Sequence, residues 1–116
     1  MMLKTVAELV KTAREQLRVV DAVTAKQELE SNQGLLIDVR ETAEYQNSPV
    51  KGAIHIARGV LEPTMLAKFN DENLPIYLHC ASGARATFAA QQLTSLGYQN
   101  VTVISCKSDD VKQVFA

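Results

Sequence analysis

Apolar positions recur at helical spacing near the start of the chain. Over residues 5–19 they fall on one stripe and leave a charged opposite face, which predicts an amphipathic helix. A short apolar stretch at 19–23 predicts a first strand. Thr24 and Gln27 have the spacing of a capping box and predict a short helix to about residue 30, which turn residues 32–34 close.

Later apolar runs are shorter and have strand character. The run at 35–39 follows a turn and ends in polar residues, as is typical of a parallel strand buried on both faces. Further strands are predicted at 53–56, 74–78 and 101–104. Residues 83–96 carry a helical pattern that Gly97 ends, and 108–116 suit a short capping helix.

This alternation predicts the fold class and the domain organisation. We expect an α/β domain with a mainly parallel central sheet of about five short strands, flanked by helices on both faces. At 116 residues the chain suits one domain, 1–116, with the helix of residues 1–19 packed on it or preceding it.

Composition narrows the classes of partner. The net charge of −1 argues against a general nucleic-acid or anionic-membrane binder, which needs a basic surplus. Charged residues interrupt every apolar run near the N-terminus, so we expect no signal peptide and no membrane span. We therefore expect a cytoplasmic protein, in which the two cysteines, Cys80 and Cys106, are reduced.

Cys80 lies where chemistry is expected in such a sheet. It follows a predicted strand and precedes a predicted helix, and ligands of open parallel sheets bind at the carboxyl ends of strands. Free N–H groups and the helix dipole stabilise a thiolate there. Small residues let the backbone wrap a sulfur atom or an anion, and Arg85 adds a positive charge; the loop is Cys80-Ala81-Ser82-Gly83-Ala84-Arg85. A cysteine at a strand end is otherwise commonly a small buried apolar residue.

A second set of residues makes the interpretation more specific. Residues 38–45 begin at the end of the apolar run at 35–39, and they occur together with Val50-Lys51-Gly52-Ala53-Ile54 and the loop at 79–85. In this order and spacing, over about residues 20–104, the three blocks resemble the rhodanese family of single-domain sulfurtransferases.

The resemblance implies an activity and roles for residues. Cys80 would take a sulfane sulfur from a small anionic donor such as thiosulfate, form a persulfide, and pass the sulfur to cyanide, a thiol or a protein acceptor. The backbone amides of residues 81–85 would cradle that persulfide, with no metal and no other cofactor. Sulfur exchange needs no obligatory general base, which suits a site without an evident triad.

Residues beside the loop have expected supporting roles. By resemblance, Asp38, Arg40 and Glu44 form a structural ion-pair block, and Arg40 and Glu44 have the spacing to pair on one helical turn. Arg58 resembles a residue at the edge of the site in some single-domain members and is a candidate for binding the anionic donor.

Other features leave questions open. The family's frequent Gly-His-Ile-Pro-Gly-Ala run is here Asn47-Ser48-Pro49-Val50-Lys51-Gly52-Ala53, and its Gly-Gly and Trp after the last strand are absent. Cys106 would be a resolving thiol if it neighbours Cys80, or else a structural thiol. His79 is expected to point away from Cys80 and to be a poor base for it.

Two rival functions remain. Cysteine phosphatases and arsenate reductases also use a Cys-to-Arg loop, but with five intervening residues, whereas four lie between Cys80 and Arg85. The same fold also serves as a non-catalytic binding or regulatory module. The oligomeric state and the physiological donor and acceptor do not follow from the sequence.

Overall fold

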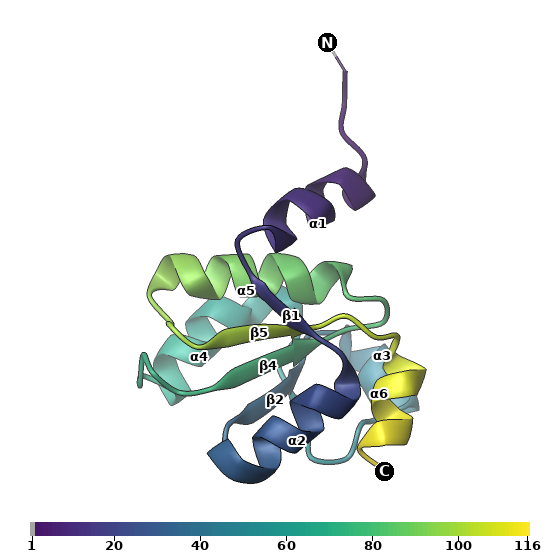
Figure 1. Cartoon of the computed structure of the whole chain (residues 1–116), viewed down its shortest axis with the longest axis vertical. Helices are drawn as coiled ribbons and strands as arrows, with labels where there is room; N and C mark the ends of the chain where they lie inside the picture. The colour runs from purple at the N-terminus through teal and green to yellow at the C-terminus, as the bar shows by residue number, and fades with distance from the viewer. Residues whose placement is uncertain (1) are drawn as a thin grey trace.

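The computed structural model describes residues 2–116, and a parallel sheet lies at its centre (Figure 1). The strands are β1 Arg18–Val20, β2 Leu35–Asp38, β3 Ile54–His55, β4 Ile76–His79 and β5 Val101–Ile104. The helices are α1 Val6–Arg14, α2 Ala22–Asn32, α3 Thr42–Asn47, α4 Leu61–Lys68, α5 Ala84–Leu96 and α6 Ser108–Val114, with a 3₁₀ turn at Arg58–Val60.

The sheet order is β1-β5-β4-β2-β3, and all four strand pairs are parallel. The predicted fold class is therefore confirmed. Because the strands are parallel, their carboxyl ends meet at one edge of the sheet. The loops that leave β2, β4 and β5 lie at that edge and carry Arg40, Cys80 and Cys106.

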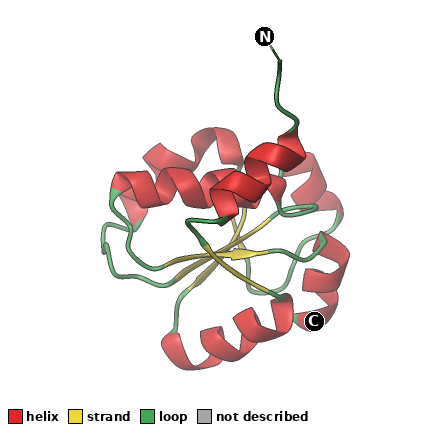
Figure 2. Ribbon diagram, turned by 45° about the horizontal axis from the view of Figure 1, so that its top comes forward, coloured by secondary structure: helices red, strands yellow, loops and turns green. Residues whose placement is uncertain are grey.

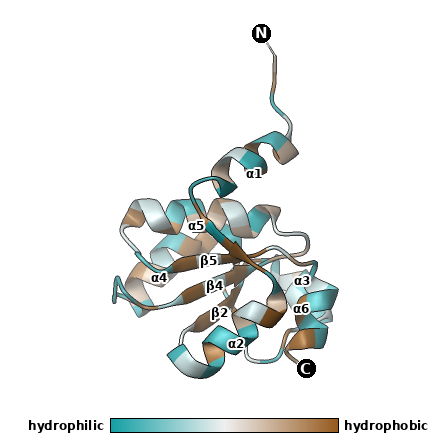
Figure 3. Ribbon diagram, viewed as in Figure 1, coloured by the Kyte–Doolittle hydropathy of each residue, from teal (hydrophilic) through white to brown (hydrophobic). Residues whose placement is uncertain are grey.

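Helices cover both faces of the sheet (Figure 2). Alternate residues of each strand point to opposite faces, so the core has two halves. One half packs β4 residues such as Leu78 against α4 and α5; the other packs Tyr77 against α2 and α6. In Figure 3 the apolar colour accordingly concentrates on the central strands. The apolar run at 35–39 is buried on both faces except at Leu35, as its pattern predicts.

The N-terminal segment differs from the prediction. Helix α1 ends at Arg14, because residues 18–20 pair with β5 as strand β1. Helix α2 begins after Asp21, whose carboxylate accepts the Thr24 N–H at 2.8 Å. The prediction that Thr24 is the cap is therefore wrong by one turn, since Asp is a strong N-cap and occupies the earlier position. Helix α1 packs against the outer side of α5 (Figure 1).

Two helices were not predicted. Helix α3 is short and starts with a capping box in which Glu41 and Glu44 bond each other's backbone amides. Helix α4 contains Pro63 in its first turn, where the ring is tolerated because the missing N–H has no helical acceptor. Leu61 and Met65 of α4 are fully buried against the sheet.

Candidate active site

Cys80 follows β4, the central strand, and its side chain is buried, with 1% of the residue exposed. Its Sγ accepts backbone N–H bonds from Gly83 at 3.0 Å and from Ala86 at 3.3 Å. Both amides belong to the N-terminal turn of α5, where N–H groups have no helical acceptor and the dipole is positive. The sulfur therefore lies where negative charge is stabilised.

Gly83 gives the loop its shape. Its φ of +96° lies in the left-handed region, which favours glycine. A Cβ at this position would also lie 2.6 Å from Nη2 of Arg14. The conformation thus requires glycine, whereas the close contact would displace the end of the Arg14 side chain. The turn points the Gly83 N–H at the Cys80 sulfur.

Arg85 directs its side chain toward α3. Its guanidinium donates to both carboxylate oxygens of Glu44, at 2.6 and 3.0 Å. This bidentate pair raises the pKa of Arg85 and lowers the pKa of Glu44 to about 2. The pair fastens the start of α5 to α3 and compensates the charge of Arg85.

Asp38 and Arg40 form a buried ion pair at the end of β2. The Arg40 guanidinium donates to both Asp38 oxygens, at 2.7 Å in the shortest contact, and to the Ser48 carbonyl at 2.8 Å. The expected pairing of Arg40 with Glu44 is wrong, because Arg40 precedes α3 and turns back to Asp38. Asp38, Arg40 and Glu44 all lie at the loop edge of the sheet, in two separate ion pairs.

His79 is fully buried beside this ion pair. Its Nε2 lies 3.8 Å from Oδ2 of Asp38, and within residues 2–116 neither ring nitrogen has a hydrogen-bond partner. Burial lowers the pKa of His79 to about 4, so the ring is neutral at pH 7. Strand alternation places it on the sheet face opposite Cys80.

Arg58 stands in the 3₁₀ turn that follows β3. Its backbone N–H donates to the Val39 carbonyl at 3.1 Å, which places the turn beside the end of β2. Its guanidinium donates to Glu62 at 2.8 Å. The positive charge of Arg58 is thus compensated, like that of Arg85.

Cys106 follows β5, next to Cys80 in strand order, but belongs to the other half of the core. Its sulfur packs with the α2 and α6 side and accepts the Ala22 N–H at 3.3 Å. Cys80 packs with the α4 and α5 side. Both thiols are free, and their placement on opposite faces favours the structural role for Cys106 over the resolving one.

Three residues of this region were missed in the sequence. The Ala86 amide lies one residue beyond the predicted cradle of residues 81–85. Thr87 Oγ1 donates to the Gly83 carbonyl at 2.7 Å and accepts from Arg14 Nε at 3.0 Å. The spacing of Thr87 after Gly83 is the one at which a Thr hydroxyl bonds the carbonyl four residues back, so this signal was available. The contact of Arg14, from a distant helix, had no local signal.

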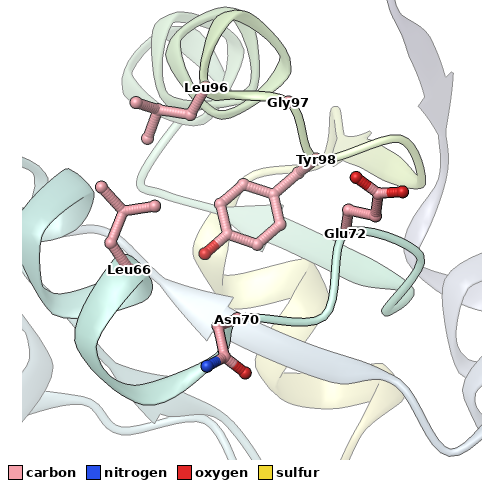
Figure 4. A pocket seen from close by; sticks show the side chains of 6 residues that line it. All are labelled: Leu66, Asn70, Glu72, Leu96, Gly97 and Tyr98. Carbon is pink, nitrogen blue, oxygen red and sulfur yellow. The ribbon is translucent and has the colours of Figure 1, made fainter.

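A separate hollow lies beside the C-terminal end of α5 (Figure 4). Its volume is about 210 Å³, and it is lined by Leu66, Asn70, Glu72, Leu96, Gly97 and Tyr98. None of these six residues is a cysteine or a cation. The lining of this hollow includes no residue of the Cys80 loop.

The site contains a buried cysteine whose sulfur contacts backbone amides at a helix N-terminus, at the carboxyl edge of a parallel sheet. Sites of this class stabilise an anion at the cysteine. The family model of the rhodanese-like domain matches residues 21–108. The chain therefore belongs to the rhodanese-like family, and the resemblance stated from its motifs is confirmed.

Two curated relatives are similar in sequence. A Bacillus subtilis (strain 168) protein named as a sulfur carrier, YrkF, is 36% identical over 77 residues, which cover 66% of this chain and 40% of that protein. A Schizosaccharomyces pombe protein named as a mitochondrial thiosulfate sulfurtransferase is 32% identical over 80 residues, covering 58% of this chain and 55% of that one. The chain thus spans about half the length of these relatives or less.

The structural comparison supports the fold. A Rhodopseudomonas palustris protein described as being of unknown function and a possible tyrosine phosphatase superposes with a TM-score of 0.81 and 16% identity. The match covers 97% of this chain and 92% of that one. At this identity the likeness shows the fold alone. Among residues 2–116, no helix is both long and apolar enough to cross a membrane.

Proposed function

We propose that this protein is a sulfurtransferase in which Cys80 carries a sulfane sulfur as a persulfide, with thiosulfate as a donor and cyanide or a thiol as the acceptor. The observation that carries the proposal is the pair of N–H groups, from Gly83 and Ala86, aimed at the Cys80 sulfur. They hold negative charge at the atom that must act as nucleophile and later as leaving group.

The loading step follows from this geometry. The Cys80 thiolate attacks the outer sulfur of thiosulfate, the S–S bond of thiosulfate breaks, and sulfite leaves with the bonding electron pair. The new outer sulfur carries the negative charge of the persulfide. The amides of Ala84 and Arg85 lie in the same first turn of α5 and have no helical acceptor, so they are suited to bind that second sulfur.

The unloading step returns the enzyme to its starting state. Cyanide attacks the outer sulfur, the persulfide S–S bond breaks, thiocyanate leaves, and Cys80 is again a thiolate. A thiol acceptor instead becomes a persulfide, and its proton moves to the transferred sulfur. Neither step needs a general base, so a neutral His79 on the opposite face of the sheet is consistent with the reaction. No cofactor or metal enters either step.

The supporting residues have structural roles in this proposal. The pairs Asp38–Arg40 and Glu44–Arg85 hold the loops after β2 and β4 in register. Arg58 is paired with Glu62, so it would bind an anionic donor only after this ion pair breaks. The cytoplasmic location expected from the sequence stays a prediction.

Intact mass spectrometry tests the proposal directly. After incubation with thiosulfate and removal of excess reagent, the wild-type chain is expected to gain the mass of one sulfur atom, and cyanide is expected to remove it. Cys106→Ser should gain the same mass, and Cys80→Ser should gain none. An unmodified wild type, or an equal gain on Cys80→Ser, would overturn the assignment of Cys80.

The phosphatase alternative is tested with the same samples. Four residues between Cys80 and Arg85 make a shorter loop than the five of cysteine phosphatases, which suits one sulfur atom better than a tetrahedral oxyanion. We expect no turnover of p-nitrophenyl phosphate by protein that transfers sulfur. Phosphatase turnover without sulfur transfer would favour the phosphatase over the sulfurtransferase. Absence of both activities would favour the non-catalytic module.

A further inference from the structure

A groove lies between α1 and the Cys80 loop. It is lined by three apolar side chains of α1, by two cations of α1 and by two loop residues: Val6, Ala7, Val10, Lys11, Arg14, Ser82 and Ala84. Its volume is about 540 Å³, which is in the range of binding sites rather than of packing defects. Ser82 and Ala84 flank Gly83, so whatever fills the groove touches the cradle of Cys80.

The groove carries two cations that no salt bridge compensates. Lys11 and Arg14 line it, no lining residue is acidic, and in the part of the chain that the structure describes neither cation forms a salt bridge. The three arginines nearer the loop edge, Arg40, Arg58 and Arg85, are each paired with a carboxylate. The unpaired cations beside the cradle therefore come from α1.

Apolar surface continues from the groove toward the N-terminus. Val6 is 60% exposed, and Leu3 and Met2 before it are almost fully exposed. A small anion such as thiosulfate has no apolar surface to place there. A polypeptide segment with apolar and acidic side chains complements both the apolar stripe and the two cations.

A hydrogen-bond chain connects this groove to the nucleophile. Arg14 Nε donates to Thr87, the Thr87 hydroxyl donates to the Gly83 carbonyl, and the Gly83 N–H donates to the Cys80 sulfur. Helix α1 itself packs on α5, the helix that supplies both amides of the cradle. A partner held on α1 is thus held against the loop that surrounds the Cys80 sulfur.

We infer that the α1 groove is the docking surface for a sulfur-accepting protein that presents its thiol on an apolar, acidic segment. The inference rests on the proposed function, since it names the acceptor of the Cys80 persulfide. In the transfer, the acceptor's thiol sulfur attacks the outer sulfur, the S–S bond breaks, and Cys80 leaves as thiolate. The acceptor becomes a persulfide, and its thiol proton moves to the transferred sulfur.

Two synthetic peptides serve as probes. Each has a single Cys after alternating Leu and Glu residues, or after alternating Leu and Lys residues. Protein preloaded with thiosulfate and freed of excess donor is mixed with each peptide, and the rate of sulfur loss from Cys80 is followed by mass. The peptides differ in intrinsic thiol reactivity, so the informative quantity is the change in the acidic-to-basic rate ratio between variants of the protein.

Lys11→Glu is the test variant, and Lys68→Glu, the same change on the exposed end of α4 outside the groove, is its matched control. We expect Lys11→Glu to lower the acidic-to-basic ratio by about tenfold or more at low salt, and high salt to shrink the difference. Lys68→Glu should keep the wild-type ratio. Both substitutions are at exposed positions, so folding is not at stake.

Each other outcome is informative. An equal ratio in Lys11→Glu and wild type would overturn the docking surface while leaving transfer to cyanide intact. Absence of cyanide-dependent release from the wild type would instead overturn the proposed function itself. A stable wild-type dimer in light scattering that Val6→Asp converts to monomer would show a second copy in the groove, and would also overturn the inference.

Discussion

The two cysteines occupy similar places with different surroundings. Cys80 comes one residue after β4 and Cys106 two residues after the adjacent parallel strand β5, and each sulfur accepts a backbone N–H from the first turn of a helix. Cys106 has one such bond, from Ala22 of a helix far away in sequence. Cys80 has two, from the helix that its own loop enters, and the left-handed turn at Gly83 aims one of them.

If Cys80 is the nucleophile, as we propose, this difference means that a helix N-terminus alone does not make one. What distinguishes Cys80 is a loop of small residues short enough to turn several amides of one helix toward one sulfur. Cys106 is a part of the α2 and α6 packing that happens to meet one amide.

The largest expected effect is on turnover. Cys80→Ser is expected to reduce thiosulfate-to-cyanide transfer to background, because a serine hydroxyl is neither ionised at pH 7 nor able to carry a sulfane sulfur. Cys106→Ser should keep activity within about twofold, since it changes only packing. The measurement is thiocyanate formation at saturating thiosulfate. Comparable loss in both variants would mean that the two sulfurs act together, against the structural role of Cys106.

The next effect separates the turn from the helix. Gly83→Ala strains a left-handed residue and brings a Cβ to 2.6 Å from Arg14. We expect a loss of about 1–3 kcal/mol in the free energy of unfolding and a fall in turnover of roughly ten- to a hundredfold as the Gly83 amide leaves the sulfur. Denaturant unfolding and the transfer assay measure the two losses.

Gly97→Ala is the matched control. Gly97 ends the same helix with φ +113°, yet nothing lies within 4 Å of an added Cβ. It should lower stability by about 1 kcal/mol and leave turnover unchanged. Equal effects on turnover from the two glycines would show that Gly83 matters only to the helix.

Sequence reasoning reached local features better than distant ones. Strand 101–104 and the end of α5 are as predicted, and the start of α5 is one residue later than predicted, because apolar runs and the glycines at both ends of α5 act locally. The end of α1 was missed because β1 pairs with β5, more than eighty residues away. The Arg85–Glu44 pair and the approach of Arg14 to the loop join distant segments and leave no local signal.

A third prediction concerns the face of the sheet opposite Cys80, where His79 is buried as a neutral ring. Its folded-state pKa, about 4, lies below the ordinary value of 6.5, so the unfolded chain binds more protons in that interval. Stability is complete above pH 6.5 and falls as the pH approaches 4, by up to about 1.4 kcal/mol per pH unit.

Urea unfolding at pH 7, 6 and 5 measures this slope above the range in which carboxylates titrate. His79→Gln is expected to flatten it, whatever the absolute stability of the variant. A slope that persists in His79→Gln would assign the proton uptake to another group and remove the claim that His79 is held neutral.

The smallest expected effect concerns Glu44, which forms an ion pair with Arg85 of the Cys80 loop. Its pKa, about 2 in the folded protein, is lowered by the Arg85 hydrogen bonds from an ordinary 4.5, so the pair stabilises the fold above pH 4.5 and the contribution fades as the pH falls toward 2. Both side chains are about one third exposed, and water therefore limits the contribution to less than about 1 kcal/mol. Glu44→Gln should cost that much in urea unfolding at pH 7 and slow transfer only a few-fold, because the amides of α5 remain in place.

Arg18→Gln is the matched control. It breaks the similarly exposed pair between Arg18 of β1 and Glu28 of α2, and should show a comparable loss of stability and no change in transfer. If Glu44→Gln slowed transfer as much as Gly83→Ala, the charge of Arg85 and not the amide cradle would control the sulfur.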